Sequence, residues 1–381
     1  MPKTIFFFHP SSDLYGADKI LIYVMRGFSS HKKYLILPCD GPLCKLVNEE
    51  LPDVEIKIIP ELPIIAKKNL KPSGILNFIY SFLRFPSKLR MDEVKPDVIY
   101  INTLAVTSVL MYYLFSKAKK VVHIHEILKN NSLLHRIINK FALRKSDVLI
   151  CVSNAVKNNM KLAAPKYEYK LQLVQNGINF KLNKARESNF EVDFDKINFG
   201  LIGRIKPDNK GQGLLLDAVS KLDMNTIAKT HFYLVGSPVV GQEYMLTDVE
   251  KMIKDLGLVE FVTIIPFVKD IESIYEKMDV VLVPSIFDDP FPTTVLEGMF
   301  FSKPVIGTQV GGIPEMIEDG VTGYVTTRGD AEALSDKIKV FVENPDQIKL
   351  MGECGKIRFT QHFSENSFHE RFQHMIQTHI F

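Results

Sequence analysis

The chain has 381 residues, of which 46% are hydrophobic and 24% charged, and this composition suits a globular protein with two domains of ordinary size. The longest apolar helical stretch, residues 104–115, is too short to cross a bilayer, and no signal peptide stands out at the N-terminus. The four cysteines lack metal-ligand spacing and show no disulfide framework, so we expect a reducing, cytoplasmic setting.

Charge is divided unevenly along the chain. Residues 1–180 carry 26 basic against 14 acidic side chains, and the remaining residues carry 21 against 30, for a net charge of +3. Within the basic half, residues 66–91 hold six cations and no acid, interleaved with apolar and aromatic residues. This pattern is typical of a segment that lies on an anionic membrane surface, and it is equally typical of an amphipathic helix with a solvated basic face.

Short β-rich apolar runs alternate with helical stretches in the first half, which predicts an α/β domain with a parallel sheet. The expected strands are residues 5–8, 34–37, 98–101, 121–124, 148–152 and 171–174. Polar residues follow almost every one of them, among them His9, Asn102 and His125. Because open α/β sheets bind ligands beyond the carboxyl ends of their strands, these residues are expected to line a cleft.

Residues 181–196 are polar and aperiodic, and they make the expected linker. A second α/β pattern follows, with strands expected at 197–203, 231–236, 261–265, 280–284 and 304–307. A final helix begins after the expected cap Ser364. The predicted domains are therefore residues 1–180 and 197–362, with a C-terminal helix over 363–381.

One loop of the second half, residues 203–213, has the composition of a phosphate site. Its glycines let backbone amides approach a ligand, and the helix that it opens adds a positive dipole end. Arg204 can fork onto phosphate oxygens, and Lys210 supplies a mobile charge, so together they suit a diphosphate. The spacing matches neither a dinucleotide fingerprint nor a P-loop, so a solvated loop remains the alternative.

The most informative stretch is residues 284–299, PSIFDDPFPTTVLEGM, which joins an expected buried strand to a helix start. It carries Asp289 and Glu297, two carboxylates suited to ligand hydroxyl groups. Thr294 and Glu297 also fit a capping box, in which Glu297 would reach back to the backbone of Thr294. Spacing alone leaves the cap and the ligand equally open for Glu297.

His123 and His125 share one face of their strand, and His125 is the nearer to its carboxyl end, with Glu126 turned to the other face. His125 is therefore either a cleft residue or a buried, hydrogen-bonded histidine.

Eight motifs in order give the chain a resemblance to glycosyltransferase family 4, the group 1 glycosyl transferases of GT-B fold. They are YGADKI (15–20), HIHE (123–126), CVSNAV (151–156), VQNGIN (174–179), GRIKPDNKGQGLLLDA (203–218), IIPFVKDIESIYEKMDVVLVPS (264–285), DPFPTTVLEGM (289–299) and GGIPEMIEDGVTGYV (311–325). The resemblance covers essentially the whole chain and is more specific in the C-terminal half. It implies two Rossmann-like parallel-sheet domains facing across a cleft, with the C-terminal helix returning to the first domain.

The resemblance also implies roles for individual residues. Arg204 and Lys210 would hold the donor diphosphate, Glu297 the ribose hydroxyls, and Asp289 the transferred sugar. Gly16 would approach the diphosphate, and His125 the sugar. The base would lie at Phe267 and Val268, and the remaining donor contacts would come from Phe291, Pro292, Thr293, Thr294 and Val295. The family usually has Glu where this chain has Asp289 and Gly where it has Pro292, so the choice of sugar is open.

By this resemblance the chain is expected to be a retaining glycosyltransferase that needs no metal or other cofactor. His125, Arg204, Lys210 and Asp289 are the expected catalytic residues, and the donor is a nucleoside diphosphate sugar. The acceptor would be a glycan or a lipid-linked molecule, met in the cytoplasm or at the inner face of a membrane, and no nucleic acid is expected as a partner. Two alternatives are a nucleotide-sugar epimerase of the same fold and a non-catalytic nucleotide-sugar-binding partner.

Overall fold

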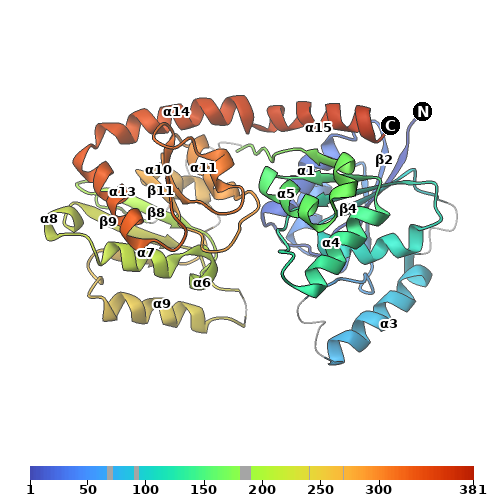
Figure 1. Ribbon diagram of the computed structural model, residues 1–381, viewed down its shortest axis with the longest axis horizontal. Coiled ribbons are helices and arrows are strands. Elements are labelled where there is room, and N and C mark those ends of the chain that lie inside the picture. The colour runs from blue at the N-terminus through green and yellow to red at the C-terminus, as the bar shows by residue number, and fades with distance from the viewer. Residues whose placement is uncertain (67–71, 90–93, 181–189, 240, 269) are drawn as a thin grey trace. The chain divides into compact units, whose positions relative to one another are not determined.

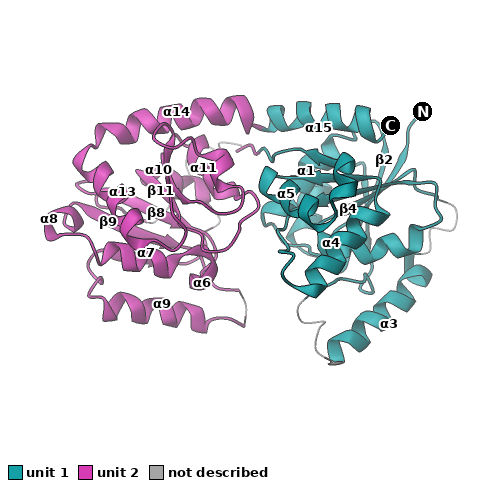
Figure 2. Ribbon diagram, in the orientation of Figure 1, with its two compact units in different colours: residues 1–177, 365–381 teal, residues 178–364 magenta. Residues whose placement is uncertain are grey.

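A computed structural model describes residues 1–66, 72–89, 94–180, 190–239, 241–268 and 270–381 (Figure 1). Two compact units divide them: unit 1 is 1–177 with 365–381, and unit 2 is 178–364 (Figure 2). Each unit contains one sheet whose paired strands are all parallel. The expected α/β class with two parallel-sheet domains is confirmed.

Unit 1 is built on a seven-stranded sheet in the order β3-β2-β1-β4-β5-β6-β7. Its strands are β1 (Thr4–Phe8), β2 (Lys32–Leu37), β3 (Val54–Ile58), β4 (Val98–Asn102), β5 (Lys119–Ile124), β6 (Val148–Cys151) and β7 (Leu171–Leu173). Its helices are α1 (Gly16–Arg26), α2 (Pro42–Glu50), α3 (Pro72–Leu89), η2 (Leu104–Tyr113), α4 (Leu133–Lys145), α5 (Asn154–Ala163), η3 (Pro165–Lys170) and α15 (Glu365–His379).

Unit 2 is built on a six-stranded sheet in the order β10-β9-β8-β11-β12-β13. Its strands are β8 (Ile197–Ile202), β9 (Thr230–Val235), β10 (Val262–Ile265), β11 (Val280–Val283), β12 (Val305–Thr308) and β13 (Gly323–Thr326). Its helices are α6 (Pro207–Lys210), α7 (Gln212–Val219), α8 (Met224–Ile227), α9 (Tyr244–Asp255), α10 (Ile271–Lys277), α11 (Thr293–Phe300), α12 (Ile313–Met316), α13 (Ala331–Glu343) and α14 (Asp346–His362).

The central strands are continuous apolar runs because helices cover both faces of each sheet. Phe6, Phe7 and Phe8 of β1 are all buried, and the ring of Phe7 lies 5.3 Å from that of Tyr100 on the neighbouring β4. The order in which successive strands join the sheet changes side between β1 and β4 in unit 1, and between β8 and β11 in unit 2. Such switch points are where open α/β sheets bind ligands.

The last helix, α15, packs in unit 1, as the resemblance implies. Phe372 of α15 meets Phe28 edge to face at 5.7 Å, and Gln373 donates to the carbonyl of Gly27. Arg26 at the end of α1 pairs with Glu365 at the start of α15. The chain thus begins and ends in the same unit (Figure 2).

Candidate functional site

The loop after β8 in unit 2 carries Arg204 and Lys210 along the carboxyl edge of the sheet. The N–H of Gly203 donates to the carbonyl of Val235 at 2.9 Å, which ties the loop to the end of β9. Gly211 has φ 83° and touches the end of β11, because a Cβ at this position would lie 1.9 Å from the carbonyl oxygen of Pro284. Only glycine fits here, and its close approach holds α6 against the end of β11.

Lys210 and Asp289 form an ion pair, with 2.7 Å between Nζ and Oδ2. The Asp289 side chain is 16% exposed and that of Lys210 34% exposed, so the pair lies at the rim of the site. The carbonyl of Asp289 accepts from Gly312 N–H at 2.9 Å, and a Cβ on Gly311 would meet that same carbonyl. The predicted catalytic pair is therefore brought together on a fixed backbone, and Arg204 is exposed on the same loop as Lys210.

Glu297 is not the capping residue that one interpretation of its motif predicts. Helix α11 begins at Thr293 after Pro292, without a side-chain cap, so Glu297 lies beyond the first turn. Its carboxylate instead accepts from the hydroxyl of Tyr275 at 2.5 Å. Burial raises the pKa of Tyr275 well above its usual value, and the Glu297 carboxylate adds to this rise, so the phenol stays protonated and donates.

The other predicted donor-binding residues of unit 2 divide by exposure. Phe291, Pro292 and Val295 are buried, so their side chains serve the core and their backbone is what they can offer a ligand. Thr293 and Thr294 are half-buried at the start of α11. Phe267 is 72% exposed beside the half-buried Val268, and its N–H donates to Ser237 Oγ at 3.0 Å, which ties the end of β10 to that of β9.

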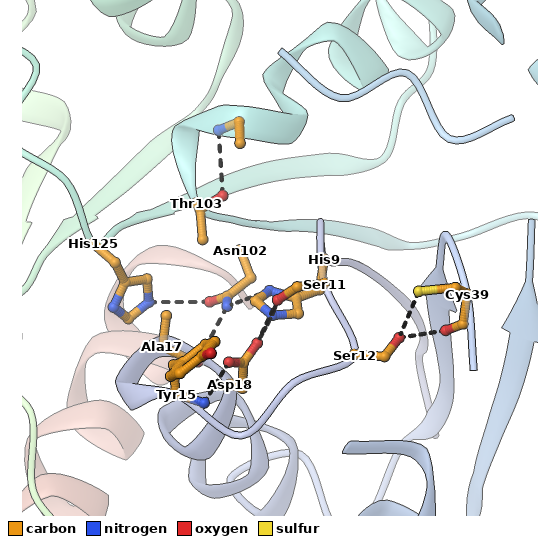
Figure 3. A network of polar contacts seen from close by, with 11 residues as sticks. His9, Ser11, Ser12, Tyr15, Ala17, Asp18, Cys39, Asn102, Thr103 and His125 are labelled. Atoms are coloured by element: carbon orange, nitrogen blue, oxygen red, sulfur yellow. Dashed lines mark hydrogen bonds and ion pairs between the residues drawn. The ribbon is translucent and has the colours of Figure 1, made fainter. Parts of the chain in front are cut away.

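The predicted residues of unit 1 meet at its switch point. Gly16 begins α1, and the carbonyl of the next residue, Ala17, lies 3.4 Å from Asn102 Nδ2 at the end of β4. The Asn102 Oδ1 atom is 3.1 Å from His125 Nε2 just past β5, and Asn102 Nδ2 is 2.9 Å from His9 Nδ1 (Figure 3). The start of α1 and the ring of His125 therefore belong to one polar cluster.

Burial keeps the imidazole of His125 neutral. It lowers the pKa of His125 well below the usual value, and the neighbouring His123 and His9 lower it further. The rings of His123 and His125 lie 4.1 Å apart, and burial lowers the pKa of His123 to about 3. A neutral ring can accept a hydrogen bond from a sugar hydroxyl, so His125 is both a cleft candidate and a hydrogen-bonded histidine.

Glu126 binds backbone groups beside His125. It lies past the end of β5, where strand alternation no longer applies, and its Oε2 accepts from the N–H groups of His125 and Leu104, each at 3.1 Å. Burial raises the pKa of Glu126 to about 7. Two further residues of this cluster were not predicted as site residues from the sequence. Asn102 is expected there only as a polar residue after a strand, and Asp18 is not expected at all. The sequence feature that could have identified Asp18 is its place at the third position of α1, where an acidic side chain caps a helix.

In the part of the chain that the structure describes, no group of three or more His, Cys, Asp or Glu side chains has the arrangement of a metal site. Among the same described residues, no helix is both long enough and apolar enough to cross a bilayer.

Two family models match the chain in succession. The model described as Glycosyltransferase Family 4 matches residues 45–182, and the one described as Glycosyl transferases group 1 matches residues 184–358. This chain belongs to the family 4, group 1 glycosyltransferases. The resemblance drawn from its motifs is confirmed.

Relatives of this glycosyltransferase include an uncharacterized glycosyltransferase of Methanocaldococcus jannaschii, 30% identical over 239 residues that make up 62% of this chain and 61% of the archaeal protein. The capsular polysaccharide biosynthesis glycosyltransferase CapM of Staphylococcus aureus is 23% identical over 318 residues, which are 84% of this chain and 77% of CapM.

Solved structures share the fold over nearly the full length. Anabaena HepE in complex with UDP and glucose gives a TM-score of 0.79 at 21% identity, with 99% of this chain and 100% of HepE covered. A Staphylococcus aureus TarM mutant in complex with UDP, alpha-GlcNAc-glycerol and fondaparinux gives 0.74 at 14% identity, with 99% and 100% covered. The GT-B fold is confirmed.

Proposed function

We propose that this glycosyltransferase transfers a sugar, with retention, from a nucleoside diphosphate donor to a hydroxyl of a glycan or lipid-linked acceptor. The reaction would serve the synthesis of a cell-surface polysaccharide or glycoconjugate, a role that the name of CapM supports. The observation that carries the proposal is the edge of the unit 2 sheet, where Arg204, the Lys210–Asp289 pair and Glu297 follow β8 and β11. UDP in the HepE and TarM structures favours UDP sugars as the first donors to try.

Each of these residues has a step in the proposed reaction. Arg204 and Lys210 neutralise the diphosphate, and their charges matter most as its bond to the sugar breaks. The acceptor oxygen forms its bond to the anomeric carbon on the face that the leaving phosphate vacates, and the leaving phosphate oxygen takes the acceptor proton. Glu297 accepts from the ribose hydroxyls, and Asp289 and His125 contact the transferred sugar. The two cations supply the positive charge in this scheme, and no metal or cofactor is required.

We further propose that α3 rests on an anionic membrane that holds the acceptor, at its cytoplasmic face. Large apolar side chains of α3 are exposed, and among them Leu76 is 68% and Leu83 71% exposed. Arg84 and Lys88 accompany them, and the helix carries no acid. Between α3 and α4 opens an apolar cavity of about 290 Å³. Four cations of the predicted basic segment, Lys67, Lys68, Lys71 and Arg90, lie outside the described residues.

The test of function incubates the full chain with a panel of nucleoside diphosphate sugars, with and without lipid-linked and glycan acceptors. We expect one donor to yield the free nucleoside diphosphate together with a product of unchanged anomeric configuration, measured by NMR. An isomerised donor without acceptor would instead identify an epimerase. Tight donor binding without any turnover would identify a non-catalytic partner.

A further inference from the structure

A continuous chain of four polar side chains crosses the switch point of unit 1 (Figure 3). It runs from Asp18 on α1 through His9 after β1 and Asn102 at the end of β4 to His125 after β5. Asp18, His9 and Asn102 are each at most 2% exposed, whereas His125 is only partly buried. Of these four side chains, His125 is therefore the one best placed to contact a ligand.

The Asp18 end of this chain can only accept hydrogen bonds. Burial alone would raise the pKa of Asp18, but hydrogen bonds from His9, Ser11 and the backbone of Tyr15 outweigh it and lower the pKa below its usual value. Ser11 Oγ donates to Oδ1 and Tyr15 N–H donates to Oδ2, both at 2.7 Å. A carboxylate has no proton to give, so His9 must carry its own proton on Nε2, the atom that contacts Asp18.

The middle of the chain is Asn102, whose amide continues the direction of donation set at Asp18. Asn102 Nδ2 lies 3.4 Å from the carbonyl oxygen of Ala17, a long contact that agrees with the amide nitrogen on this side. The same nitrogen donates to His9 Nδ1 at 2.9 Å. Asn102 Oδ1 then faces His125 and accepts from Nε2–H at 3.1 Å. The Asp18 carboxylate thus sets the direction of donation along the chain, and the longer contact of 3.4 Å to the Ala17 carbonyl agrees with it.

We propose that Asp18, His9 and Asn102 are positioning residues that hold His125 in its Nε2–H tautomer and leave Nδ1 as a hydrogen-bond acceptor. With the proposed function, the group that Nδ1 accepts from is a hydroxyl of the transferred sugar. The choice of tautomer itself depends only on contacts inside unit 1 and is independent of that assignment.

Asp18→Asn gives a specific expectation, because it removes the charge and keeps the shape. The Tyr15 N–H still needs an acceptor, so the new carbonyl oxygen faces Tyr15 and the new NH₂ faces His9. His9 then accepts on Nε2 and donates from Nδ1, the Asn102 amide turns over, and His125 receives a hydrogen bond on Nε2. The direction of the whole chain reverses, and the proton of His125 moves to Nδ1.

The experiment measures the His125 tautomer in the full chain labelled with ¹⁵N-histidine, by two-bond ¹H–¹⁵N correlation, with His125→Gln to assign the signal. We expect Nε2–H in the wild type and a shift to Nδ1–H in Asp18→Asn. We also expect kcat/KM to fall about 10- to 100-fold in this variant, since the sugar loses its acceptor. Tyr100→Phe is the matched control: it removes a buried hydrogen bond of 2.9 Å to His123 on β5 and should leave the His125 tautomer and turnover unchanged.

An unchanged His125 tautomer in Asp18→Asn would overturn the proposal, whatever happens to turnover. An equal shift in Tyr100→Phe would also overturn it, because any buried defect would then suffice. If the tautomer shifts as expected while the wild type turns over no donor, the positioning chain stands and the proposed function fails.

Discussion

At the residue scale, the Lys210–Asp289 pair is where we propose that unit 2 meets the donor diphosphate. The ammonium is 2.7 Å from a carboxylate that is itself held by the backbone around Gly311, so it has a fixed starting position at the rim of the site. The Asp at position 289 pairs with Lys210, and its side chain is one methylene shorter than the Glu that the resemblance leads us to expect, so we propose that it reaches less far toward the donor sugar.

Lys210→Met should lower kcat/KM for sugar transfer about 10²–10³-fold, because a charge aimed at the leaving group is lost. Steady-state release of the nucleoside diphosphate measures it. Lys229→Met removes an exposed cation at the opposite edge of the same sheet, just before β9, and should leave turnover unchanged. Equal losses in both variants would mean that overall charge, and not a local contact, governs the rate.

Glu126 should make stability depend on pH. Its pKa is about 7 in the folded chain against 4.5 for the free side chain, so the folded state binds the proton more tightly between these values. Stability therefore falls as pH rises from 4.5 to 7. Glu126→Gln removes this titration. The free energy of unfolding of the variant minus that of the wild type should therefore increase by about 1–3 kcal/mol from pH 5 to pH 8. Urea denaturation at both pH values checks it, and a constant difference would contradict it.

At the element scale, α3 is the helix whose exposed face most needs an explanation. Leu76→Glu with Leu83→Glu should reduce co-sedimentation with phosphatidylglycerol vesicles at least tenfold, because each change removes exposed apolar area and adds a repelled charge. Leu350→Glu, a similarly exposed leucine on α14, is the control and should bind as the wild type does. Equal binding to vesicles of pure phosphatidylcholine would contradict the role of the cations.

Elements with continuous apolar character are predictable from sequence, and the others are not. The buried strands are all found within two residues at either end, whereas β3 and β13 are not predicted. The sequence of β3, VEIKI, alternates with charge because it is an edge strand, and β13, GYVT, is short and begins at Gly323. The capping box at Glu297 fails for a related reason: Pro292 starts the helix early, and a distant tyrosine then competes for the carboxylate.

At the scale of the whole molecule, two parallel sheets each present a switch point, and the sequence marks both by the polar residues after their strands. What the sequence leaves out is the set of partners: that Lys210 pairs with Asp289, that Glu297 takes the Tyr275 hydroxyl, and that Asp18 reaches His125 through two other side chains. These contacts join residues from separate helices and loops that follow different strands, so they depend on strand order, which local patterns do not contain.

Donor binding at the carboxyl edge of the unit 2 sheet is the proposal on which the function of the chain depends. Hydrogen exchange measured by mass spectrometry, with and without saturating nucleotide sugar, tests it most directly. We expect slower exchange in residues 203–213 and 289–299, with the opposite edge around Lys229 unchanged. Exchange that stays the same in both segments with every nucleotide sugar, or protection confined to other parts of the chain, would contradict it.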